Sequence, residues 1–289
     1  VNATVGLKPV KAAMDAVLKI DHRRTFPKYS QGTFEGWMKK QREAQAAFPK
    51  QVSFFHGCYV NYNNPALGKD FVKVMNALGI GVQLLEKEKC CGVALISNGF
   101  INQAKRQAKV NVASIRKAAG GQGMPVLATS STCTFTLRDE YPHLLGIDNA
   151  DVRDNIELAT RYVYRLLQSG GAKLRFREDA PKIRVAYHTP CHMEKLGWSY
   201  YSIELLKMIP SVELTVLDSQ CCGIAGTYGF KKENYETSQA IGESLFRKIE
   251  ASGCDLVATD CETCKWQIEM STSKRVEHPL SILASAIYG

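Results

Sequence analysis

The 289-residue sequence contains no long hydrophobic run and no secretory signal. A transmembrane helix needs about 18 to 20 consecutive apolar residues, and no apolar segment approaches that length. The N-terminus lacks the charged start and apolar core of a signal peptide. We therefore expect any attachment to a membrane to be peripheral, and nothing indicates an oxidising compartment.

Excess positive charge is scarce outside the N-terminal part of the chain. The formal net charge is +9, and residues 1–50 hold ten Lys/Arg against four Asp/Glu, which leaves +3 for the rest. A nucleic-acid-binding protein carries its basic residues on a folded surface, so this distribution argues against a nucleic-acid partner. The composition, 45% hydrophobic and 22% charged, is that of an ordinary globular protein of about two domains.

Cysteine is abundant, and nine of the ten cysteines fall into two copies of one pattern. The first copy consists of Cys58, Cys90, Cys91 and Cys133, and the second consists of Cys191, Cys221, Cys222, Cys261 and Cys264. Corresponding cysteines lie 131 or 133 positions apart, and glycine follows each adjacent pair. One position differs, because Ser130 stands where the second copy has Cys261. The pattern indicates a duplication in which the first copy has lost one thiol.

Short apolar runs alternate with helical patterns in both copies, which is typical of an α/β fold with parallel sheets. The expected strands are residues 52–55, 82–85, 125–128, 183–187, 212–217 and 256–258. The expected helices are residues 67–78, 101–118, 153–168, 200–209 and 238–249. Each cysteine group follows the end of a strand, where open α/β sheets place their ligand sites.

The chain is expected to have four parts. A basic N-terminal helical segment covers residues 1–50, and a first cysteine-rich domain covers 51–169. A linker at 170–182 leads to the second cysteine-rich domain at 183–289. The repeat implies that the two domains are related by a pseudo-two-fold axis, each with a small, mainly parallel sheet flanked by helices.

Three kinds of chemistry could use these thiols. Disulfides are disfavoured, because adjacent cysteines such as Cys90 and Cys91 can bridge only through a strained ring. Structural zinc usually takes four ligands from two CxxC pairs, whereas the second copy offers five thiols and one CxxC. Thiolates in strand-end loops, with one adjacent pair, favour an iron-sulfur cluster.

The cysteine pattern resembles the CCG domain of heterodisulfide reductase B subunits and their relatives. Three stretches are also similar to the C subunits of bacterial anaerobic glycerol-3-phosphate dehydrogenases. They are Phe-His-Gly-Cys-Tyr-Val-Asn-Tyr-Asn from Phe55, His-Thr-Pro-Cys-His-Met-Glu-Lys from His188, and Thr-Asp-Cys-Glu-Thr-Cys-Lys-Trp from Thr259. The resemblance extends over essentially the whole chain and implies two tandem CCG domains.

The resemblance implies an iron-sulfur electron-transfer subunit, without substrate oxidation of its own, that passes electrons from flavin-containing dehydrogenase subunits toward membrane menaquinone. It implies a peripheral position on the cytoplasmic face of the inner membrane. Alternatives are the iron-sulfur subunit of a lactate or glycolate oxidising complex, or a heterodisulfide-reductase-type disulfide reductase. Related subunits begin with a ferredoxin module bearing CxxCxxCxxxCP motifs. Such a motif is missing here and the chain starts at Val1, so we expect it to be part of a longer protein.

By the same resemblance, the five cysteines of the second copy match the ligands of a noncubane 4Fe-4S cluster. The four cysteines of the first copy match except at Ser130, whose hydroxyl loses its proton far less readily than a thiol. The first domain is therefore expected to hold a weaker or different cluster, or none.

Other residues beside the cysteines are candidates for contacts with a cluster. His56, His188 and His192 could donate hydrogen bonds to cluster sulfur or move a proton, or they could simply bond to backbone at strand ends. Gly223 and Gly226 could let backbone amides approach a cluster, or form an ordinary turn.

The N-terminal stretch 9–24 predicts a basic amphipathic helix. Val10, Met14 and Val17 share one face, with lysines and arginines around it. Such a helix could lie on an anionic lipid surface, or it could dock on the protein itself.

Overall fold

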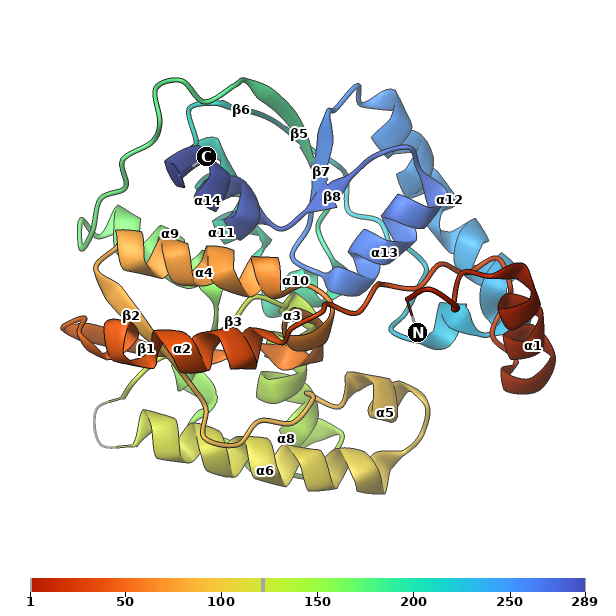
Figure 1. Ribbon diagram of the computed structural model, residues 1–289, viewed down its shortest axis with the longest axis horizontal. Helices are drawn as coiled ribbons and strands as arrows, with labels where there is room; N and C mark the ends of the chain where they lie inside the picture. The colour runs from red at the N-terminus through yellow and green to blue at the C-terminus, as the bar shows by residue number, and fades with distance from the viewer. Residues whose placement is uncertain (1, 121–122, 289) are drawn as a thin grey trace.

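The computed structural model describes residues 2–120 and 123–288, and two four-stranded sheets organise these residues (Figure 1). All strands within each sheet are parallel. The first sheet has the order β2-β1-β3-β4, formed by Ile80–Leu84, Lys50–Phe55, Val126–Ala128 and Ile156–Leu158. The second has the order β6-β5-β7-β8, formed by Val212–Val216, Ile183–Tyr187, Leu256–Ala258 and Val276–Glu277.

The two sheets repeat one topology, which confirms the duplicated α/β architecture. Corresponding strands of the two halves occupy the same place in their sheets, so the first strand of each half lies second from one edge. The six predicted strands are all present, with ends shifted by at most two residues. The short edge strands β4 and β8 were not predicted.

The prediction of a helix over residues 153–168 is wrong in its first part. Residues 156–158 form β4, which pairs with β3 so that Val126 lies opposite Ile156. Only Ala159–Gln168, named α9, is helical. The buried side chains of Ile156 and Leu158 pack within the sheet, and this tertiary pairing outweighs the local helical pattern.

Four helices lie between the two sheets and join the halves into one core (Figure 1). They are α4 (Pro65–Ala77), α9, α11 (Ser199–Lys207) and α14 (Pro279–Tyr288). Helix α14 packs on α4, and α11 packs on α9. Buried residues of both sheets, including Val52 and Val185, belong to this single hydrophobic cluster. The boundaries of the two proposed domains stay a prediction, but their cores are continuous.

The outer face of each sheet has its own helical layer. Helix α6 (Ile101–Ala119) packs against the first sheet, and α12 (Tyr235–Ala251) and α13 (Glu262–Ser271) pack against the second. Shorter helices occupy the connections: α3 (Gly57–Tyr62), α5 (Val93–Ser97), α7 (Ser131–Phe135), α8 (Tyr141–His143) and α10 (Cys191–Leu196).

Two helices precede the first strand. Helix α1 (Lys8–Leu18) is shorter than the predicted stretch 9–24, because the chain turns at Lys19 with a φ of 56°. Ile20 then forms a bridge to Lys231 of the second half. Helix α2 (Phe34–Ala46) packs against β2 and α4. Within the described residues, no helix combines the length and apolar character needed to cross a bilayer.

Candidate metal centres

Each cysteine set gathers at the carboxyl ends of three strands. Cys58 and Cys133 lie in the short helices after β1 and β3, and Cys191 and Cys264 lie in the helices after β5 and β7. The adjacent pairs lie in the loops after β2 and β6. Parallel strands end at the same edge, so residues far apart in the sequence meet there. No cysteine forms a disulfide.

The first set joins its thiols in a chain of contacts. The Sγ atoms of Cys58 and Cys90 are 3.8 Å apart. Hydrogen bonds from the thiols of Cys58 and Cys91 lower the pKa of Cys90, against the opposing effect of burial. Cys91 is buried and also contacts Cys133. One thiol of the set therefore favours the thiolate, which is the form that binds metals.

The second set has a similar arrangement with deeper burial. The Sγ atoms of Cys222 and Cys264 are 3.2 Å apart, and both residues are buried. Hydrogen bonds from Cys221 and Cys264 hold the pKa of Cys222 well below its ordinary value. Cys261 is buried and contacts Cys264, whereas Cys191 and Cys221 are exposed.

His188 tests whether a cluster fits at the second set. His188 is only 1% exposed, and among the described residues neither ring nitrogen has a partner at hydrogen-bond geometry, although the ring lies close enough to Cys222 to help lower the pKa of that thiol. A ring nitrogen and the Sγ atoms of Cys222 and Cys264 lie within 4.8 Å of one another. A buried polar group without a well-placed partner is costly, so a bound cluster or metal beside the Cys222 and Cys264 thiols would stabilise this histidine. Thiols with one imidazole are a donor set that suits an iron-sulfur cluster.

The other two histidines have partners within the protein. His56 Nδ1 lies 2.9 Å from the Gly57 carbonyl oxygen and 3.2 Å from a carboxyl oxygen of Glu88. His192 Nδ1 lies 2.9 Å from the Thr132 hydroxyl, and burial lowers the pKa of His192 to about 4. Of the three candidates, His188 has the geometry for a direct contact with a cluster.

Ser130 has a structural use for its hydroxyl. The oxygen accepts a hydrogen bond from the backbone N–H of Cys133 at 3.2 Å, and so caps the N-terminus of α7. The hydroxyl donates to the Glu262 carboxylate at 2.8 Å, across the boundary between the halves. Cys261, at the equivalent place before α13, provides no side-chain cap. The lost thiol has thus been replaced by a helix cap.

The two cysteine sets lie on either side of one boundary between the halves. The Thr132 hydroxyl is 3.5 Å from Cys261 Sγ, and the backbone N–H of Ser131 donates to the Asp260 carbonyl at 2.9 Å. The sequence interpretation missed both Thr132 and its counterpart Thr263, whose hydroxyl is 3.2 Å from Cys261 Sγ. Their matching positions in the two copies were the available signal.

The two candidate glycines differ in what they do. Gly223 has a φ of +83°, and its backbone N–H donates to Cys221 Sγ at 3.3 Å. A Cβ at this position would lie 2.0 Å from the Ser238 carbonyl oxygen, so only glycine lets α12 approach the cysteine loop. Gly226 has a φ of +63° and faces Ser97 of the first half.

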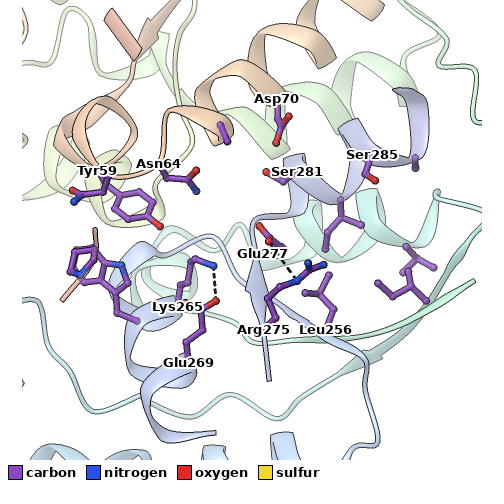
Figure 2. Close-up of a pocket in the computed structure, with 18 of the residues that line it drawn as sticks. Tyr59, Asn64, Asp70, Leu256, Lys265, Glu269, Arg275, Glu277, Ser281 and Ser285 are labelled. Carbon is purple, nitrogen blue, oxygen red and sulfur yellow. Dashed lines mark hydrogen bonds and ion pairs between the residues drawn. The ribbon is translucent and has the colours of Figure 1, made fainter. Parts of the chain in front are cut away.

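A cavity of about 750 Å³ lies between the halves (Figure 2), and part of its lining comes from residues close in sequence to the cysteines. Tyr59 and Trp266 are part of its lining, with ring centroids 5.4 Å apart. Tyr59 follows Cys58 directly, and Trp266 lies on the helix that carries Cys264. The lining also includes Asp70 and Lys265.

Comparisons with known proteins agree with this geometry. The cysteine-rich domain family CCG matches residues 52–138 and 185–269. The C subunit of the anaerobic glycerol-3-phosphate dehydrogenase of Escherichia coli (strain K12) is 65% identical over 99% of this chain and 72% of that protein.

More distant relatives include the D subunit of the dihydromethanophenazine:CoB--CoM heterodisulfide reductase of Methanosarcina barkeri, 28% identical over 83% of this chain and 60% of that protein. Lactate utilization protein A of Bacillus velezensis is 30% identical over 73% of this chain and 87% of that protein. The two family matches together cover more than half of the chain and include every cysteine of the duplicated pattern. The chain belongs to the family of cysteine-rich CCG-domain proteins.

Proposed function

We propose that the chain is an iron-sulfur, electron-transferring subunit of an anaerobic glycerol-3-phosphate dehydrogenase. It receives electrons from flavin-containing dehydrogenase subunits and passes them toward a membrane quinone, menaquinone. The observation that carries the proposal is the buried His188, which faces the thiols of Cys222 and Cys264 and has no other hydrogen-bond partner among the described residues. The similarity to the Escherichia coli protein supports the identity of the complex.

In this proposal the second set holds a 4Fe-4S cluster, which supplies a one-electron carrier when bound. Its ligands are Cys191, Cys221, Cys222, Cys261 and Cys264. His188 donates a hydrogen bond to cluster sulfur or completes the coordination. The first set, with four thiols, is the weaker site, because the Ser130 hydroxyl is engaged in capping α7. A disulfide reductase with two complete five-thiol sites is disfavoured for the same reason.

Replacing one ligand tests the assignment. Cys222→Ser should strip iron from anaerobically purified protein and bleach its visible absorbance. Cys254→Ser is the matched control, because Cys254 is buried at 3% exposure but lies outside both sets. Equal iron content in the two variants would refute the assignment of the second set.

The cavity between the halves is the proposed site for the quinone ring. Its volume of about 750 Å³ lies in the range of small-molecule pockets. The Tyr59 and Trp266 rings offer a stacking surface next to residues of both cysteine sets. Quinone reduction takes up two electrons and two protons, and burial raises the pKa of Asp70, a carboxyl that lines the cavity.

The cavity assignment predicts that Trp266→Leu slows reduction of a water-soluble menaquinone analogue by the reduced protein. Trp37→Leu is the control, because Trp37 packs on Phe34 of α2 and does not line the cavity. Equal rates for the two variants, with iron content unchanged, would refute the cavity as the quinone site while leaving the cluster assignment intact.

Helix α1 is the proposed contact with anionic lipid at the cytoplasmic face of the inner membrane. Its flanking and terminal apolar side chains remain uncovered, with Leu7 51%, Val17 75% and Leu18 60% exposed. Lys8 and Lys11 add positive charge to the same helix. Apolar side chains beside lysines are typical of interfacial helices.

Vesicle sedimentation tests this contact. Val17→Asp with Leu18→Asp should weaken binding to vesicles of anionic lipid, and rising salt should weaken the binding of the unmodified protein. Leu144→Asp is the control, since Leu144 is 55% exposed away from α1. If the double variant sediments as the control does, α1 is not the lipid contact.

A further inference from the structure

Arg24 is a fully buried arginine that has no role in the function proposed above. Its side chain is 1% exposed and lies among residues of the second half. The guanidinium donates to the side-chain oxygen of Gln267 and, at 3.0 Å, to the Ser238 hydroxyl. Its central carbon lies 4.6 Å from the Tyr235 ring centroid and 5.7 Å from that of Phe230. These neighbours are all neutral.

No carboxylate in the described parts of the chain forms an ion pair with Arg24. The nearby Asp21 is paired with Arg23 at 2.8 Å, and the buried Nε atom of Arg24 has no hydrogen-bond partner among the residues that the structure describes. Burial lowers the pKa of the Arg24 guanidinium, and the nearby Tyr235, Asp21 and Cys222 oppose this change in that order. A buried charge without a directly paired counter-charge is strongly destabilising, so a further anion close to the guanidinium would stabilise it.

The guanidinium is linked to the second cysteine set through both of its hydrogen-bond partners. Gln267, which it contacts, is on α13 three residues after Cys264. Ser238 is the other hydrogen-bond partner of Arg24. The Ser238 carbonyl oxygen packs closely against Gly223, which directly follows the cysteine pair. Both hydrogen-bond partners therefore belong to the walls of the second set.

We propose that Arg24 is the built-in counter-charge of the cluster held by the second set, and that it raises the reduction potential of that cluster. The inference rests on the proposed function. A cluster with thiolate ligands is anionic, and reduction adds one more negative charge. A fixed positive charge nearby stabilises the reduced form more than the oxidised form. Arg24 acts through the field at the cluster, so it is a positioning and tuning residue.

Two substitutions neutralise this charge in different ways. Arg24→Gln removes it, and Gln267→Glu keeps Arg24 but places a carboxylate against it. We expect each to change the oxidised-to-reduced ratio at a fixed potential about tenfold toward the oxidised form, equivalent to about 59 mV for a one-electron couple. Potentiometric titration of the anaerobic, iron-loaded protein, followed by electron paramagnetic resonance, measures the shift.

Two further variants separate charge from packing. Arg24→Lys keeps the charge and should restore a potential close to that of the unmodified protein. Arg23→Gln removes a neighbouring arginine that is 43% exposed and paired with Asp21, and should leave the potential unchanged. If Arg24→Gln fails to retain iron, Gln267→Glu and Arg24→Lys still decide the question.

The inference is overturned if iron-loaded Arg24→Gln or Gln267→Glu protein titrates at the potential of the unmodified protein. It is also overturned if Arg24→Lys shifts the potential as far as Arg24→Gln does. Failure of the proposed function gives a different result, because the unmodified protein would then bind no cluster to titrate.

Discussion

Substitution of Ser130 should lower the stability of the metal-free protein, whereas a cysteine at this position should raise the iron content of the iron-loaded protein. Ser130→Ala removes the hydroxyl that caps α7 and donates to Glu262. Loss of an N-cap costs about 1 kcal/mol. The second hydrogen bond adds about 1 kcal/mol, the usual net contribution of one hydrogen bond. We expect the free energy of unfolding of the reduced, metal-free protein to fall by about 2 kcal/mol.

Ser130→Cys should also destabilise the metal-free protein, because a thiol is a weak acceptor and caps a helix poorly. In the iron-loaded protein the same substitution restores a fifth thiol at the position of Cys261. Iron per chain should therefore rise. Urea unfolding under reducing conditions and iron analysis measure the two effects.

The control for capping is Ser169→Ala, since Ser169 is exposed and its hydroxyl donates only to the Leu166 carbonyl in its own helix. Its effect should stay within about 0.5 kcal/mol. If Ser130→Ala changes stability no more than this control, the capping role is refuted. If the unmodified protein already carries two spectroscopically equivalent clusters, the argument from the missing thiol is wrong.

Two further predictions concern the backbone and the N-terminal segment. Gly223→Ala should destabilise the protein by about 3 kcal/mol or more in urea unfolding, because its Cβ would meet the Ser238 carbonyl oxygen. Gly146→Ala, with a positive φ but open space around it, should cost only about 1 kcal/mol. A hydrogen bond from Lys232 holds the pKa of Asp15 at about 2, below the ordinary 3.8, so its stabilising effect is complete above pH 3.8 and disappears as the pH falls toward 2. Asp15→Asn should therefore speed pepsin cleavage within α1, relative to the unmodified protein, near pH 4 but not near pH 2. The same ratio of cleavage rates between the two proteins at both pH values would contradict this prediction.

The fold was largely predictable because most strands are apolar runs bounded by turns. The edge strands β4 and β8 were not predicted from the sequence, for two different reasons. β8 has only two residues, Val276 and Glu277, too few to show a pattern. β4 continues directly into α9, and its three residues are too few to distinguish a strand from the first turn of a helix.

The candidate site was predictable only in part. The spacing of the cysteines placed both sets at strand ends, and the structure brings each set together there. The spacing could not distinguish His188 from His56, because the difference lies in which way each ring turns at the end of its strand. Arg24 was beyond prediction, since its distance from the second copy along the chain conceals its contact with Gln267.

The packing of α14 on α4 has a consequence for synthesis. α14 is the last helix described, and the Tyr288 hydroxyl donates to the Lys73 carbonyl of α4 at 3.2 Å. On the ribosome, the first half emerges long before the helix that completes its core. The apolar surface of the first half therefore stays exposed to water until residues 279–288 leave the exit tunnel. A nascent chain stalled before α14 would therefore be a client for chaperones, although every strand of both sheets had already been made.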